Sequence, residues 1–137
     1  MTCYLTIEVF YFSIPEYLLM IAKNISQDAT STEWNSFWQI WVEEFSREIE
    51  SWDTILIDIR TTEELEIYGT ISENQSHIIF GTETFAEQIL ELDRNKKYLL
   101  YCWHWHRSAV TREFMQEQWF TWVKDLAWGI DRWNKIM

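Results

Sequence analysis

Short apolar runs alternate with amphipathic stretches along most of the chain. Thr54–Asp58 is apolar enough to form a strand buried on both faces of a sheet, and the apolar run in Lys97–Tyr101 predicts a second strand that ends at Cys102. Shorter strands are predicted over Phe37–Ile40, Ser76–Phe80 and Thr121–Lys124. Helical spacing of apolar residues predicts helices over Val42–Ile49, Thr61–Ile67, Thr84–Leu92, Ser108–Gln118 and Ile130–Ile136. Thr61 and Glu64 are also spaced to form a capping box at the start of the second of these helices. Strands that alternate with helices indicate an α/β fold with a doubly wound, mostly parallel sheet and helices on both faces.

The beginning of the chain differs from the remainder, so we predict an N-terminal extension and linker over 1–35 and one domain over 36–137. Val9–Ala22 is apolar, but Glu8, Pro15 and Glu16 interrupt it and no basic residue precedes it. It therefore fits neither a secretory signal nor a membrane span well. An added element packed on the domain is the simpler interpretation, a degenerate signal or anchor stays open, and the expected location is the cytoplasm.

The chain is strongly acidic, with a net charge of −11 and a pI near 4.6. We therefore expect it to bind neither nucleic acid nor an anionic membrane surface. Cys3 and Cys102 are its two cysteines and cannot form a disulfide framework, which favours a reducing compartment. The sequence has no Cys/His spacing typical of a zinc site, so we expect no metal and no cofactor.

Cys102 directly follows the apolar run Tyr98–Tyr101, and Arg107 and Ser108 follow it. This order places the thiol in a loop between the carboxyl end of a strand and the N-terminus of a helix, where sites lie in parallel sheets. Unpaired N–H groups and the helix dipole favour a thiolate there, so we expect the pKa of Cys102 to be lowered. The Arg107 guanidinium offers a fork of donors to an oxyanion.

Several segments, in order, resemble the rhodanese family, and residues 54–137 are similar to a single rhodanese domain of sulfurtransferase fold. Ile55–Arg60 with Thr61–Leu65 resembles the family's first strand and acidic helix. Tyr68–Ile71 resembles its Gly-His-Ile-Pro segment, although Thr70 and Ser72 depart from it. Tyr101–Ser108 resembles the active-site loop, and Asp125–Trp133 resembles the closing Leu-x-Gly-Gly-x-x-x-Trp signature.

The resemblance implies that Cys102 takes a sulfane sulfur from a small-molecule donor such as thiosulfate and holds it as a persulfide. The acceptor would be cyanide in an assay and a small-molecule or protein thiol in a cell. Attack requires a thiolate, and backbone N–H groups would stabilise the charged persulfide. Asp58 and Arg60 would support the loop rather than react. The implied loop comprises Trp103, His104, Trp105, His106, Arg107 and Ser108.

His104 and His106 have two interpretations. They could tune the thiolate or bind a metal, and the simpler interpretation is that both are exposed loop residues.

Trp105 stands where the family has a loop glycine, which reaches positive φ easily and admits a close backbone approach. Trp119 stands where the family has a glycine after the helix, and Trp128 where the closing signature has its first glycine. The chain has three glycines beside ten tryptophans, whereas usual composition would give roughly ten glycines. One hypothesis is that UGA codons read as glycine by the source were translated as tryptophan; divergence or design is the alternative.

Three classes of function therefore stay open. The first is a sulfurtransferase that uses Cys102, and the second is a catalytically inactive rhodanese-like module that binds a partner because Trp105 blocks the loop. The third is a cysteine-dependent phosphatase or arsenate reductase, whose anion loop typically has five residues between cysteine and arginine. Only four residues separate Cys102 from Arg107 here, which favours sulfur over a tetrahedral phosphate.

Overall fold

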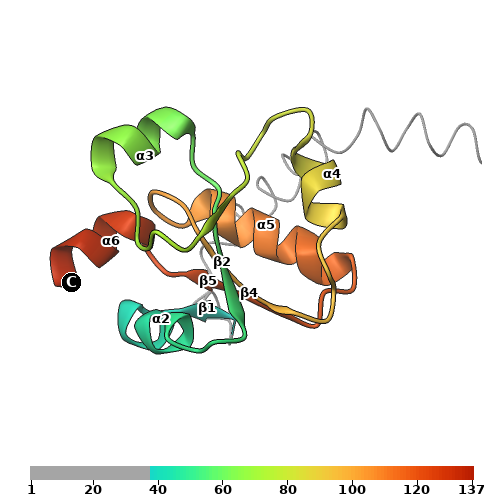
Figure 1. Ribbon diagram of the computed structural model, residues 1–137, viewed down its shortest axis with the longest axis horizontal. Helices are drawn as coiled ribbons and strands as arrows, with labels where there is room; N and C mark the ends of the chain where they lie inside the picture. Colours follow the sequence, from blue (N-terminus) through green and yellow to red (C-terminus); the bar gives the residue numbers. More distant parts are fainter. Residues whose placement is uncertain (1–37) are drawn as a thin grey trace, which may run out of the picture.

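The computed structural model describes residues 38–137 of the chain (Figure 1). The predicted extension over 1–35, the apolar segment Val9–Ala22 and Cys3 lie outside the described residues, as does Phe37 at the start of the first predicted strand. Within residues 38–137, no helix combines the length and the apolar character needed to cross a bilayer.

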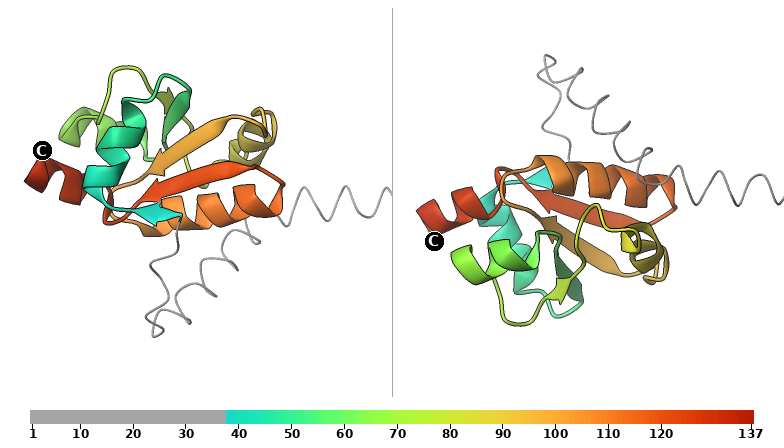
Figure 2. Two further views of the ribbon diagram at one scale, coloured as in Figure 1. Left: turned by 90° about the horizontal axis from the view of Figure 1, so that it is seen from below. Right: turned by 90° about the horizontal axis from the view of Figure 1, so that it is seen from above.

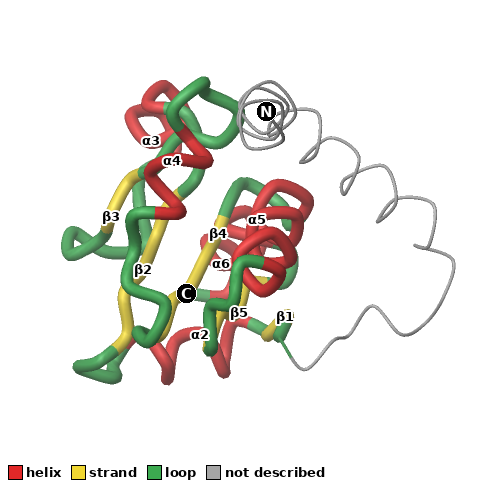
Figure 3. The backbone as a smooth tube through the Cα atoms, turned by 90° about the vertical axis from the view of Figure 1, so that its right-hand side faces the viewer, coloured by secondary structure: helices red, strands yellow, loops and turns green. Residues whose placement is uncertain are grey.

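A parallel sheet forms the centre of the fold. Its strands run in the order β1-β5-β4-β2-β3, and every neighbouring pair is parallel (Figure 3). The two apolar runs that the pattern singled out become adjacent central strands, because both faces of each must be buried. The strands are β1 (Gln39–Ile40), β2 (Thr54–Asp58), β3 (Ser76–His77), β4 (Lys97–Tyr101) and β5 (Trp122–Leu126).

Helices cover the sheet on both faces (Figure 2). One face packs with α4 and α5 around Phe85, Val110 and Phe114, and the other packs with α2 and α6 around Phe45 and Ile130. The predicted α/β fold with helices on both faces of a parallel sheet is therefore confirmed. The helices are α2 (Val42–Ile49), α3 (Thr62–Tyr68), α4 (Phe85–Leu90), α5 (His106–Glu117) and α6 (Gly129–Ile136).

Several predicted boundaries need correction. The strand predicted over Thr121–Lys124 runs over Trp122–Leu126, and the helix predicted over Thr84–Leu92 runs over Phe85–Leu90. The strand expected over Ser76–Phe80 ends at His77, although the N–H groups of Ile78 and Phe80 still donate to carbonyls at the end of β2 and just beyond it. Helix α5 begins at His106 rather than Ser108, because the carbonyl of Trp105 already accepts from the N–H of Ala109. His106, Arg107 and Ser108 thus form the first helical turn and are not part of the loop.

Two tryptophans adopt the left-handed backbone conformation that favours glycine. Trp119 follows α5 with φ of 69°, and Trp128 precedes α6 with φ of 64°. They are the non-glycine residues with positive φ within residues 38–137. Both positions carry the strain of a side chain in left-handed backbone. These are two of the three positions at which the resemblance to the rhodanese family implies glycine.

Candidate active site

Cys102 lies directly beyond the carboxyl end of β4 and begins a short loop over residues 102–105. The loop leads into α5, and α3 and α6 lie at the same end of the sheet (Figure 1). The side chain of Cys102 belongs to the core cluster between the sheet and α5, and the residue is 1% exposed. The thiol is therefore at the expected place in the fold but is covered.

The backbone of the loop is docked onto the start of α6. The N–H of Ile130 donates to the carbonyl of Cys102 at 3.0 Å, and the N–H of Asp131 donates to that of Trp103 at 3.1 Å. Gly129 has φ of 58°, and its Cα faces the carbonyls of the loop. These bonds use N–H groups that a helix N-terminus leaves unpaired, so α6 fixes the loop as well as closing the fold.

Replacing Gly129 with alanine is expected to destabilise the fold by about 2 kcal/mol, because positive φ and a steric clash act together. A Cβ at this position would lie 2.2–2.4 Å from the carbonyl oxygens of Cys102, Trp103 and His104. Urea unfolding measures the effect. Gly81→Ala is the matched control, because Gly81 has φ of 84° and open space around it. Equal losses in both variants would refute the clash.

Burial dominates the electrostatics of the thiol. Desolvation raises the pKa of Cys102, which corrects the expectation of a lowered value. Hydrogen bonding to Ser108 and the charge of Arg107 oppose this shift but do not outweigh it. The Cys102 thiol donates to Ser108 Oγ across 3.5 Å, and the Ser108 hydroxyl also faces the carbonyl of Trp105 at 3.0 Å.

Arg107 directs its guanidinium at Glu64 of α3. Nη1 donates to Oε2 at 2.8 Å and Nη2 to Oε1 at 2.6 Å, so the fork that was expected to bind an anionic donor already holds a carboxylate. Glu64 Oε2 also accepts from the N–H of Thr61, and Thr61 Oγ1 accepts from the N–H of Glu64. The predicted capping box is thus confirmed, and its glutamate also ties α3 to α5.

The Arg107–Glu64 pair gives a testable dependence of stability on pH. The guanidinium of Arg107 lowers the pKa of Glu64 from 4.5 to about 2. A lowered carboxyl pKa stabilises the fold fully above pH 4.5, and this contribution is lost as the pH falls towards 2. Because the pair is partly exposed and screened by solvent, Glu64→Gln should lose only about 1–2 kcal/mol at pH 7, and much less near pH 2. Urea unfolding of Glu64→Gln beside Glu63→Gln checks this, and an equal loss at both pH values would contradict it.

Asp58 and Arg60 form a buried ion pair at the end of β2, with Nη2 and Oδ2 2.7 Å apart. Arg60 also donates to the carbonyls of Glu64 and Gly69, at the two ends of α3. Gln75 donates to Asp58 at 3.3 Å. These contacts hold α3 and the segment after it, and Glu64 of α3 in turn pairs with Arg107 of α5.

The two tryptophans of the loop, Trp103 and Trp105, pack against different parts of the protein. Trp105 is half-buried and packs against the core cluster that contains Cys102. Trp103 packs against Tyr68 of α3, with ring centroids 4.4 Å apart and the rings tilted by 45°. Trp105 has φ of −154°, so this position does not require the positive φ of a glycine. The difference from the family's glycine therefore lies in the added indole side chain and not in the backbone conformation.

His104 of the loop and His106 of α5 lie beside different residues. His104 is exposed and lies 3.7 Å from Asp131 of α6, while the ring of His106 contacts that of Trp105. No three His, Cys, Asp or Glu side chains within residues 38–137 are placed to hold a metal ion.

A family model for the rhodanese-like domain matches residues 42–136, which is most of the chain. This protein belongs to the rhodanese-like family. Among solved structures it resembles a rhodanese-related protein from Thermoplasma volcanium, at 28% identity and a TM-score of 0.62, over 72% of this chain and 92% of that one. The sequence matches no curated protein.

Two sulfurtransferases share this rhodanese-like fold. The polysulfide-sulfur transferase homodimer of Wolinella succinogenes has 21% identity and a TM-score of 0.62, over 83% of each chain. The human single-domain sulfurtransferase has 13% identity and a TM-score of 0.60, over 74% of this chain and 99% of that one. At these identities the likeness is one of fold alone.

The rhodanese-like site contains a buried carboxylate that the sequence analysis missed. Asp125 of β5 is fully buried, accepts from Arg112 Nε of α5 at 2.5 Å and from Gln39 Nε2 of β1 at 3.0 Å, and lies 3.5 Å from Ser108 Oγ. A signal was present, because Lys124 and Asp125 place two consecutive charges in a central strand, where a charge must be paired.

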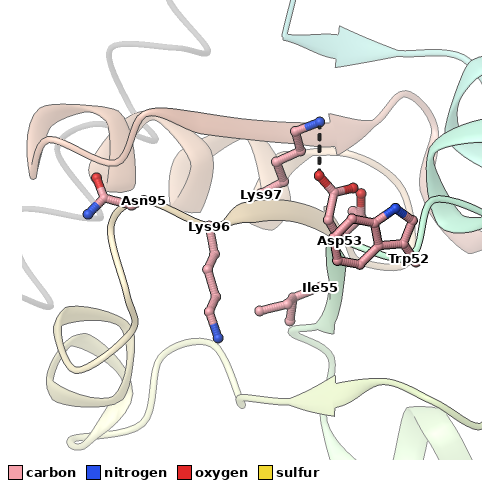
Figure 4. Close-up of a pocket in the computed structure, with 7 residues that line it drawn as sticks. Trp52, Asp53, Ile55, Asn95, Lys96 and Lys97 are labelled. Carbon is pink, nitrogen blue, oxygen red and sulfur yellow. Dashed lines mark ion pairs between the residues drawn. The ribbon is translucent and has the colours of Figure 1, made fainter.

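A surface pocket lies at the opposite end of the sheet (Figure 4). Trp52, Asp53 and Lys97 line it, and Lys97 pairs with Asp53 at 3.3 Å. Lys97 begins β4, whereas Cys102 follows its end. This pocket is therefore separate from the rhodanese-like site.

Proposed function

We propose that this protein is a sulfurtransferase that carries a sulfane sulfur on Cys102. The proposal rests on the position of the Cys102 thiol, at the carboxyl end of β4 and beside the first turn of α5. Ser108 contacts the thiol, and the charge of Arg107 acts on it. Thiosulfate, a small-molecule donor, would be cleaved between its sulfurs as the thiolate attacks the outer one. Cys102 gains a persulfide anion and sulfite leaves.

The second half-reaction returns the thiolate. The outer sulfur of the persulfide is attacked by cyanide, giving thiocyanate, or by a small-molecule or protein thiol, giving a new persulfide on the acceptor. No cofactor is needed, because both steps are sulfur displacements. A free thiol suits a reducing compartment, so we place the protein in the cytoplasm and the activity in the domain over 36–137.

The mass of the intact protein after treatment with thiosulfate tests the proposal. We expect the chain to gain one sulfur atom, Cys102→Ser to gain none, and cyanide to remove the sulfur again. Cys3→Ser is the matched control and should keep the gain. Absence of sulfur on both the chain and Trp105→Gly would overturn the proposal.

Burial of the thiol favours a second candidate, a rhodanese-like module that binds a partner without transferring sulfur. Cys102 is covered, and the Arg107 fork is occupied by Glu64. Sulfur uptake by Trp105→Gly and not by the chain itself would favour this module. The same occupied fork disfavours a phosphatase or arsenate reductase, because those enzymes need the arginine for their oxyanion.

A further inference from the structure

A chain of buried polar groups connects the thiol to a carboxylate on the neighbouring strand. The Cys102 thiol donates to Ser108 Oγ at 3.5 Å, and Ser108 Oγ lies 3.5 Å from Asp125 Oδ2. All three residues are at most 1% exposed. Arg112 and Gln39 hold the carboxylate in place. The groups come from β4, α5 and β5, so only the folded sheet brings them together.

We infer that Asp125 receives the proton of Cys102 through the Ser108 hydroxyl when the thiol becomes a thiolate. The S–H bond of Cys102 breaks as its proton passes to Ser108 Oγ, and the original O–H bond of Ser108 breaks as that proton passes to Asp125 Oδ2. The products are a thiolate, an intact hydroxyl and a neutral carboxylic acid. The inference deepens the proposed sulfur transfer and rests on it.

Charge balance in the buried site is the main argument. Release of the thiol proton to solvent would leave two anions, Cys102 and Asp125, beside each other in the core. Internal transfer keeps one negative charge and so avoids the repulsion and the added desolvation. Burial already raises the pKa of Asp125, so this carboxylate holds a proton more readily than an exposed one.

The charged neighbours fit this role. Arg112 lies against Asp125, and burial together with the charge of Asp125 raises the pKa of Glu113 on the same helix. Arg107 is the cation that acts on Cys102, and it remains paired with Glu64. The Ser108 hydroxyl donates either to the carbonyl of Trp105 or, after rotation, to Asp125. Rotation of this one hydroxyl therefore connects or disconnects the relay.

The inference is tested by the rate at which iodoacetamide alkylates Cys102 between pH 6 and 8. Peptide mass measures this rate, and the measurement does not require sulfur transfer. Internal transfer makes the thiolate fraction independent of pH, so we expect less than a threefold change in rate across this range. Asp125→Asn and Ser108→Ala should instead show about a tenfold rise per pH unit, because the proton must then leave to solvent. Both Trp105→Gly and the chain itself should show the flat profile.

Three variants make the test decisive. Asp125→Asn leaves Arg112 unpaired, so the double variant Arg112→Gln/Asp125→Asn repeats it without a lone buried charge. Thr111→Val removes a buried hydroxyl from the same helix, one that bonds to the backbone, and should keep the flat profile. A tenfold rise per pH unit in both the chain and Trp105→Gly, or a flat profile in Ser108→Ala, would overturn the relay. A flat profile without sulfur uptake would instead overturn the proposed function alone.

Discussion

Replacement of Trp105 with glycine is expected to accelerate both alkylation and sulfur loading of Cys102 by on the order of 30- to 160-fold. The indole packs on the cluster that buries the thiol, and exposing a side chain of this size costs about 2–3 kcal/mol. A reagent reaches Cys102 only when the indole moves away and is exposed to water. Removing this free-energy requirement accelerates the reaction by the corresponding factor. Glycine can adopt the observed φ of −154° freely, so the loop backbone need not change.

Leu92→Ala is the matched control for Trp105→Gly. Leu92 also packs against the same core cluster, but it precedes β4, at the end of the sheet away from Cys102. General loosening of the core would accelerate alkylation in both variants, whereas uncovering of the thiol accelerates it only in Trp105→Gly. Equal rates in Trp105→Gly and the parent chain would show that the indole does not limit access.

The features that were predictable from sequence are those set by neighbours along the chain. The capping box of Thr61 and Glu64 spans four residues, and the runs that become β2 and β4 carry their own apolar signal. The position of Cys102 at a strand end followed from the same local pattern. Periodicity and capping depend on adjacent residues, so a sequence contains the information needed to predict them.

Long-range pairing accounts for what could not be predicted. Glu64 and Arg107 are 43 residues apart, and Gln39 and Asp125 are 86 apart, so their contacts exist only once the sheet order is set. The pKa of Cys102 was predicted in the wrong direction for the same reason. The helix N-terminus was visible in the sequence, but the burial that outweighs it comes from side chains of several elements.

Replacing Trp119 and Trp128 together with glycine is expected to stabilise the protein by about 3 kcal/mol, since each side chain in left-handed backbone costs about 1–2 kcal/mol. Trp119 is 83% and Trp128 52% exposed, so little packing is lost. Each single variant should contribute about half, because Trp119 follows α5 and Trp128 precedes α6, so the two positions act separately. Urea unfolding at neutral pH measures the effect.

Trp52→Gly separates this effect from simple removal of an exposed tryptophan. Trp52 is 95% exposed and does not have positive φ, so glycine there should destabilise by about 0.5–1 kcal/mol through added freedom of the unfolded chain. If glycine destabilises the protein at Trp52 and stabilises it at Trp119 and Trp128, the backbone conformation at the latter two positions favours glycine. Stabilisation at all three, or at none, would contradict it. UGA codons at Trp119 and Trp128 would then trace the strain to decoding, whereas UGG codons would make both tryptophans genuine and leave the strain as a property of the protein itself.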